Sequence, residues 1–171
     1  MPNGTAASGR GDFAFTILRN FVLSSWALLM WQRLATSSDE QLSAIAGKAV
    51  KEARYHREHA ADWVVRLGDG TDESTRRMAR ALERLWPYCA ELFDADETDR
   101  EAAAQGLGPA WSSLEEAWRA DVSAVLDEAG MALPADSAFR SDGKRGRHSE
   151  HMGRLLAEMQ YLHRAFPGGV W

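Results

Sequence analysis

Apolar residues recur at steps of three and four along most of this chain of 171 residues. That spacing places them on one side of an α-helix, whereas a half-buried strand requires strict alternation, and no strand pattern emerges. The clearest series is Leu42, Ile45, Ala49, Ala53, His56, Ala60, Trp63 and Leu67. The pattern predicts an all-α protein, and because the segments between helices are mostly short, the helices are expected to pack as antiparallel neighbours.

Two long helices are predicted first. The apolar residues of 13–34 cover more than one helical stripe, which is typical of a largely buried helix. Ser38, with Gln41 three residues later, resembles a capping box for a second helix that ends at Leu67. Gly68 is expected to take the left-handed conformation that commonly closes a helix.

A third helix is predicted to be kinked. Its apolar face would carry Met78, Leu82, Leu85, Cys89 and Leu92. Pro87 interrupts this helix, because proline lacks an amide hydrogen and clashes with the preceding turn, so the kink is expected near Trp86. The acidic residues 94–101 are expected to continue as a short exposed helix.

Two further helices complete the predicted fold. One runs from Trp111 to Gly130 and is followed by an irregular segment over 131–147. Ser149 is expected to cap the last helix, and Pro167 is expected to stop it. The core-facing residues of the last helix would be Met152, Leu155, Met159, Leu162 and Phe166.

One domain is expected. Residues 1–12 are rich in small and polar residues and are predicted to be a flexible lead, because ordering glycine is entropically costly. Residues 13–166 would form a single helical domain, and residues 167–171 a C-terminal tail. Seven Trp and six Phe supply large rings for a core, an interface, or both.

Charge and composition exclude several partners. The net charge of −5, with acidic and basic residues interspersed, gives no broad basic field for nucleic acid or anionic lipid. The most apolar stretch, 20–32, lies between Arg19 and Arg33 and is shorter than the ~20 residues that span a bilayer. The single Cys89 cannot form an internal disulfide and fits a reducing compartment. These features indicate a cytoplasmic protein without membrane or nucleic-acid partners.

Helical bundles commonly hold two-iron or two-manganese centres, which use glutamates and Glu-x-x-His motifs on facing helices. Residues three apart on a helix project together, so this motif brings carboxylate and imidazole to one ion. No histidine here has a glutamate three residues earlier, and residues 13–35 contain no Asp or Glu. We therefore expect no catalytic residue, no metal ligand set and no cofactor bound by this chain.

Glu52 and His56 are the best remaining pair of potential ligands. They lie four residues apart, at the margin of the apolar stripe of the second helix. A buried imidazole needs a hydrogen-bond partner, which a carboxylate one turn earlier can supply. We interpret the pair as a polar core contact, with a degenerate metal site as the alternative.

A second polar cluster surrounds the start of the last helix. Cations close to a helix N-terminus can bind an anion such as phosphate or contact a partner, but a helix start also needs a cap and favours an acidic residue. A structural role is the favoured interpretation, and an anion or partner contact is the alternative. The cluster consists of Lys144, Arg145, Arg147, His148, Glu150 and His151.

Several blocks resemble the C subunit of ring-1,2-phenylacetyl-CoA epoxidases in order and spacing. The resemblance spans nearly the whole chain. The blocks are 51–56, 62–63, 66–71, 85–86, 90–97, 143–144, 148–151 and 156–162.

The resemblance implies a ferritin-like helical bundle and a structural role. The C subunit of that family pairs with a related A subunit, which carries the di-iron centre and binds the coenzyme A thioester. The resulting complex epoxidises the aromatic ring during phenylacetate degradation, with electrons from a separate reductase. Family members carry two further bundle helices before the segment resembled here, so the bundle is expected to be N-terminally truncated. The uncovered apolar faces favour self-association and predict poor solubility when the chain is expressed alone.

The sequence therefore predicts a non-catalytic structural subunit of the multicomponent phenylacetyl-CoA ring epoxidase, a monooxygenase, that stabilises its di-iron subunit. One alternative is a ferritin-like enzyme whose degenerate or oligomer-shared metal site uses Glu52, His56, Glu150 and His151. Another is a helical binding or regulatory module with no oxygenase connection.

Overall fold

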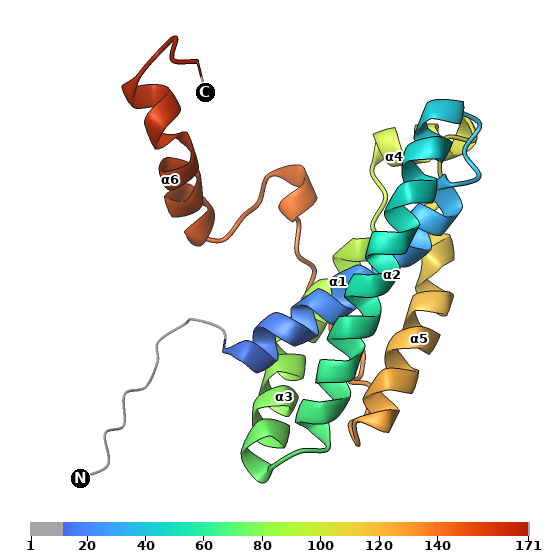
Figure 1. The fold of residues 1–171 in the computed structure, drawn as a ribbon, viewed down its shortest axis with the longest axis vertical. Helices are drawn as coiled ribbons and strands as arrows, with labels where there is room; N and C mark the ends of the chain where they lie inside the picture. Colours follow the sequence, from blue (N-terminus) through green and yellow to red (C-terminus); the bar gives the residue numbers. More distant parts are fainter. Residues whose placement is uncertain (1–11, 171) are drawn as a thin grey trace. The chain divides into compact units, whose positions relative to one another are not determined.

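The computed structural model describes residues 12–170, and these residues form helices joined by turns and loops (Figure 1). Within this range the only β-type pairing is an isolated bridge between Asp142 and Arg147. The all-α prediction is therefore confirmed. The flexible lead predicted for 1–12 lies, apart from Asp12, outside the described residues.

The α-helices are α1 (Phe13–Leu34), α2 (Glu40–Gly68), α3 (Asp72–Leu85), α4 (Glu97–Ala104), α5 (Glu115–Glu128) and α6 (His151–Ala165). The 3-10 helices are η1 (Trp86–Phe93), η2 (Trp111–Leu114) and η3 (Gly143–Arg145).

The chain divides into two compact units, one ending at Arg140 and the other beginning at Ser141. This division differs from the single domain expected for 13–166. The physical reason lies in α6, which buries none of its side chains. The two units are therefore described one at a time.

The core of the first unit is built around α1, which contacts α2, α3 and α5. α2 buries mainly alanines, and small side chains let two helices pack closely. Trp118 of α5 is 1% exposed, and its indole N–H donates to the Val22 carbonyl of α1 at 3.0 Å. The rings of Trp86 and Phe93 pack on Trp118, with centroids 5.7 and 5.2 Å away. The apolar spacing thus correctly predicted Met78 and Leu82 on the buried face of α3.

α1 is long and apolar enough to cross a membrane, and it is the one helix among residues 12–170 that passes this test. The sequence prediction excluded a span because Arg19 and Arg33 flank the apolar stretch. A core helix passes the same test of length and composition, and α1 packs in that position. Its buried residues are Ala14, Ile17, Leu18, Phe21, Val22, Ser25 and Met30.

The start of α2 differs from the prediction. The N-cap is Asp39, whose carboxylate accepts a hydrogen bond from the Leu42 amide at 2.7 Å. Ser38 instead donates its hydroxyl to the Gln105 carbonyl at 3.2 Å, while its amide donates to the Gly106 carbonyl at 3.0 Å. These two bonds tie the start of α2 to the end of α4, which local sequence spacing could not reveal.

The end of α2 also differs, because the helix includes Gly68 and is capped by Asp69. Gly68 does not take a left-handed conformation. A Cβ atom at Gly68 would lie 2.5 Å from the Ala129 carbonyl oxygen and 2.7 Å from the Ala129 Cβ. Glycine is needed here because the end of α5 passes too close for a side chain.

The third helix was expected to continue past a kink near Trp86, and its interruption at Pro87 is confirmed, but the α-helix ends there instead of bending. α3 ends at Leu85, and the chain continues as the 3-10 helix η1 with Pro87 in its first turn. The acidic helix expected near 94–101 is α4, which buries no side chain. Its N-cap Asp96 forms a reciprocal capping box with Asp99. η1 brings Cys89 and Phe93 to the side of α5, where both line a cavity with Trp118.

Candidate functional site

Glu52 and His56 lie on the exposed side of α2, and no hydrogen bond joins these two side chains. The interpretation of a polar core contact is therefore wrong, because neither group needs a buried partner. The Tyr55 ring lies beside two imidazoles, with centroids 5.7 Å from His56 and 6.1 Å from His59. The local result is an exposed aromatic and imidazole surface on α2.

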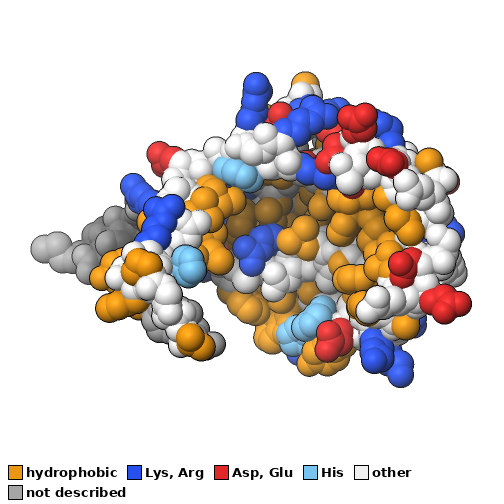
Figure 2. All heavy atoms as spheres, turned by 90° about the horizontal axis from the view of Figure 1, so that it is seen from above, with side chains coloured by type: hydrophobic (Ala, Val, Ile, Leu, Met, Phe, Trp, Pro, Cys, Tyr) orange, Lys and Arg blue, Asp and Glu red, His pale blue; other side chains and the backbone are white. Residues whose placement is uncertain are grey.

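His56 and His59 border a groove of about 400 Å³ between α1 and α2. Its walls are largely apolar and include Ile17, Leu23 and Ala27 of α1. Figure 2, which views the molecule from above, shows hydrophobic surface lying beside charged and histidine side chains. An open groove of this kind suits an apolar helix or side chain better than a small charged ligand, and we call it the α1/α2 groove.

A metal centre has few candidate ligands here. Within residues 12–170, no group of three or more His, Cys, Asp or Glu side chains is placed to hold a metal ion. Glu52 and His56 belong to the first unit, whereas Glu150 and His151 belong to the second. The absence of a cofactor from this chain remains a prediction that rests on its ligand inventory.

The polar cluster predicted near the last helix lies in the second unit. Lys144, Arg145, Arg147, His148, Glu150 and His151 are all exposed. Asp142 lies 3.7 Å from Arg145 Nε and 3.8 Å from Arg147 Nε, and its carbonyl accepts a hydrogen bond from the Arg147 amide at 3.1 Å. Two of the cations thus stabilise a tight turn, and an anion or partner contact stays a prediction.

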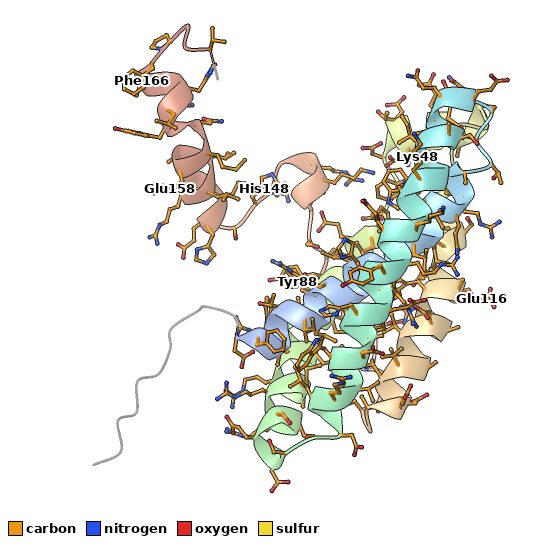
Figure 3. All side chains as sticks on the ribbon, in the orientation of Figure 1. Lys48, Tyr88, Glu116, His148, Glu158 and Phe166 are labelled. Atoms are coloured by element: carbon orange, nitrogen blue, oxygen red, sulfur yellow. The ribbon has the colours of Figure 1, made fainter. Side chains whose placement is uncertain are left out.

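The prediction that Ser149 caps α6 is wrong. The N-cap position of α6 is Glu150, and no side chain caps that end. Of the five apolar residues expected to face a core, four are exposed, including Leu155 at 53% and Met159 at 72%, and Met152 is partly exposed. His148 precedes α6, Glu158 lies on it and Phe166 follows its end (Figure 3). Among its described residues, the second unit holds no other α-helix against which this face can pack.

A cavity of about 250 Å³ in the first unit was not predicted from the sequence. It lies between η1, the start of α5 and the segment after α5. The Arg119 guanidinium contributes to its wall and donates to Asp136 at 2.7 Å and to Glu115 at 2.9 Å. The hydrogen bond to Asp136 is the main cause that raises the pKa of Arg119, with burial opposing it and the bond to Glu115 adding to it. The lining residues include Trp86, Cys89, Phe93, Trp118, Arg119, Asp136, Ser137 and Arg140.

Cys89 lies in this cavity wall with 7% of its surface exposed. Burial raises the pKa of the thiol to about 12, and the nearby charge of Arg119 opposes this only weakly. The thiol is therefore protonated at neutral pH and a poor nucleophile. This agrees with the sequence interpretation of Cys89 as part of an apolar helical face.

An ion pair between Arg57 and Asp121 links α2 to α5 and was also not predicted. Arg57 Nε donates to Asp121 Oδ2 at 3.2 Å, and the guanidinium lies 5.7 Å from the centroid of the Phe21 ring. The two residues are 64 positions apart. Nothing in local spacing signals such a contact, which holds the bundle together and offers no reactive group.

The fold and surface thus define an all-helical bundle protein with an apolar groove. A comparison with protein families identifies the class: the family described as "Phenylacetic acid catabolic protein" matches residues 1–171. The chain belongs to this family, as its sequence blocks predicted, and the ferritin-like bundle expected from the resemblance fits the observed fold.

A curated relative narrows the similarity further. The C subunit of the 1,2-phenylacetyl-CoA epoxidase of Escherichia coli (strain K12) is 46% identical over 161 residues. The match covers 94% of this chain and 65% of the relative. The resemblance seen in the sequence blocks is therefore confirmed, and the chain spans 65% of the length of that relative.

Proposed function

We propose that this chain is a non-catalytic subunit of a multicomponent phenylacetyl-CoA ring epoxidase acting in phenylacetate degradation. The observation that carries the proposal is the 46% identity, over 94% of the chain, to a protein named as the C subunit of such an enzyme. A cytoplasmic location belongs to the same proposal.

The inventory of ligands supports a role without catalysis. A di-iron bundle site needs glutamates and Glu-x-x-His motifs on facing helices. The sequence contains no Glu-x-x-His, and α1 contributes neither Asp nor Glu. The di-iron centre would belong to a partner, the A subunit of the epoxidase, and would supply oxygen activation there. The part of this chain would be to bind and stabilise that partner.

The α1/α2 groove supports binding to a helical partner. Leu23, an exposed large apolar side chain of α1, lines this groove together with Ile17, Ala27 and Ala60. Exposed apolar surface that lines a groove is typical of interaction sites in soluble proteins. A partner helix laid on the groove would cover Leu23 and the imidazoles of His56 and His59.

The test is co-expression of the full chain with a tagged catalytic partner, followed by affinity purification. The proposal predicts that the two chains co-purify in a fixed ratio. Leu23→Asp should weaken recovery, because it places a charge in the groove. Ala120→Asp is the matched control on the exposed side of α5 and should not. Failure of the unmodified chains to co-purify would remove the proposal.

Self-association through the same groove is the other expected use of this surface. Size-exclusion chromatography of the chain alone, at low concentration, tests it. Larger species that Leu23→Asp shifts toward monomer would support self-association. A clean monomer with cooperative melting would argue against it.

A further inference from the structure

The segment after α5 turns back along the first unit without forming a helix. Gly130 takes φ +70°, its amide donates to the Asp127 carbonyl, and the Met131 amide donates to the Leu126 carbonyl at 2.8 Å. This pattern is a Schellman cap, which ends α5 and reverses the chain. We call residues 132–140 the strap.

The strap is held to the first unit by few bonds. Among the described residues, no backbone-to-backbone hydrogen bond ties 132–140 to the rest of the unit. The guanidinium of Arg140 donates to carbonyls of the strap itself, those of Ser137 and Phe139. Leu133 packs at the edge of the core and anchors the beginning of the strap.

Two side-chain contacts fasten the rest of the strap. Asp136 accepts the hydrogen bond from Arg119 at 2.7 Å, but its side chain is 73% exposed. The Phe139 ring packs edge-on against Tyr88, labelled in Figure 3, with centroids 5.1 Å apart. These two residues are 47% and 55% exposed. Exposed ion pairs and half-exposed ring pairs are weak fastenings.

The cavity of about 250 Å³ lies beneath the strap. Asp136, Ser137 and Arg140 supply its wall on the strap side, whereas Cys89 and Trp118 belong to the opposite elements. Trp118 packs in the fully buried core, so its side of the cavity is anchored far more firmly than the strap.

We propose that the strap is a lid that opens locally over this cavity while the helical core stays folded. Regions with few buried contacts and no backbone pairing open at a lower free energy than the core. Opening would separate Asp136 from Arg119, which keeps Glu115 as a partner. It would also expose Cys89 to solvent, so that the thiol reports on the position of the lid.

The test is the rate at which a soluble disulfide reagent labels Cys89 in the full chain under native conditions. Because Cys89 is the single cysteine, all labelling belongs to this site. Asp136→Asn should speed labelling roughly 1.5- to 5-fold, the factor expected for loss of an exposed ion pair. Phe139→Ala should speed it roughly 2- to 10-fold by removing the ring contact. Glu128→Gln, an exposed change on α5, is the control and should leave the rate unchanged.

The dependence of the labelling rate on urea separates the lid from global unfolding. Local opening predicts a labelling rate that rises only slightly with urea below the unfolding transition, since little surface is exposed. A urea dependence equal to that of global unfolding, with both strap variants labelling at the control rate, would overturn the proposal.

Discussion

α5 and α6 carry the same kind of apolar stripe, yet only α5 buries it. Trp118, Val122, Val125 and Leu126 of α5 are buried, whereas α6 buries no side chain. The difference lies in the neighbours, because α5 packs against α1 and α2, while the described part of the second unit contains no other α-helix. Periodicity therefore specifies a helix and the face it offers, but not what covers that face.

The largest difference in the free energy of unfolding is expected between two variants, one that shortens an apolar side chain of α5 and one that shortens an apolar side chain of α6. Trp118→Ala should lower the free energy of unfolding by about 3–5 kcal/mol, because it removes a buried ring and its hydrogen bond to Val22. Met159→Ala, at a 72% exposed position of α6, should change it by less than about 0.5 kcal/mol in the chain alone. Urea denaturation followed by circular dichroism measures both. Equal losses would mean that α6 shares the core.

Effects of intermediate size on the free energy of unfolding are expected from substituting two glycines of α2. Gly68→Ala should destabilise by about 1–3 kcal/mol, because the added Cβ would overlap the Ala129 carbonyl. Gly47→Ala meets no atom within 4 Å and should stabilise the helix by about 0.5–1 kcal/mol. Thermal melts of the two variants provide the comparison. A neutral Gly68→Ala would show that the contact between α2 and α5 is looser than the structure describes.

The smallest effects on the free energy of unfolding are expected from breaking one ion pair in each unit. Asp121→Asn should cost about 1 kcal/mol, since it breaks a half-buried pair with Arg57 that links two helices. Asp142→Asn removes only contacts of 3.7 and 3.8 Å to exposed arginines and should cost about 0–0.5 kcal/mol. Chemical denaturation of both variants at low and high salt measures the two losses of stability. A larger loss of stability for Asp142→Asn than for Asp121→Asn would contradict this expected order.

The parts of the fold that local chemistry determines were predictable. Apolar spacing predicted α1, α2 and α5, and the missing amide of Pro87 predicted that the third helix is interrupted near Trp86. The sequence blocks at 51–56 and 148–151 predicted the family that the comparison then identified. Each of these signals lies within a short stretch of sequence.

The parts that depend on distant segments were not predictable. Ser38 bonds to Gln105, so Asp39 takes the cap instead. Gly68 is needed for the approach of Ala129 and not for a turn. Glu52 and His56 were expected in the core, but the face of α2 that carries them is exposed. The cavity beneath the strap is lined by residues from three separate segments, and no local sequence pattern predicts it.

The most direct test of the proposed role is the iron content of the purified chain and of its complex with the catalytic partner. The absence of a Glu-x-x-His motif and of acidic residues from α1 predicts no stoichiometric iron in the chain alone. The complex should contain about two irons for each catalytic partner chain, as a two-iron bundle site holds. Two irons bound within a single copy of this chain, with all protein ligands from that copy, would contradict the proposed role.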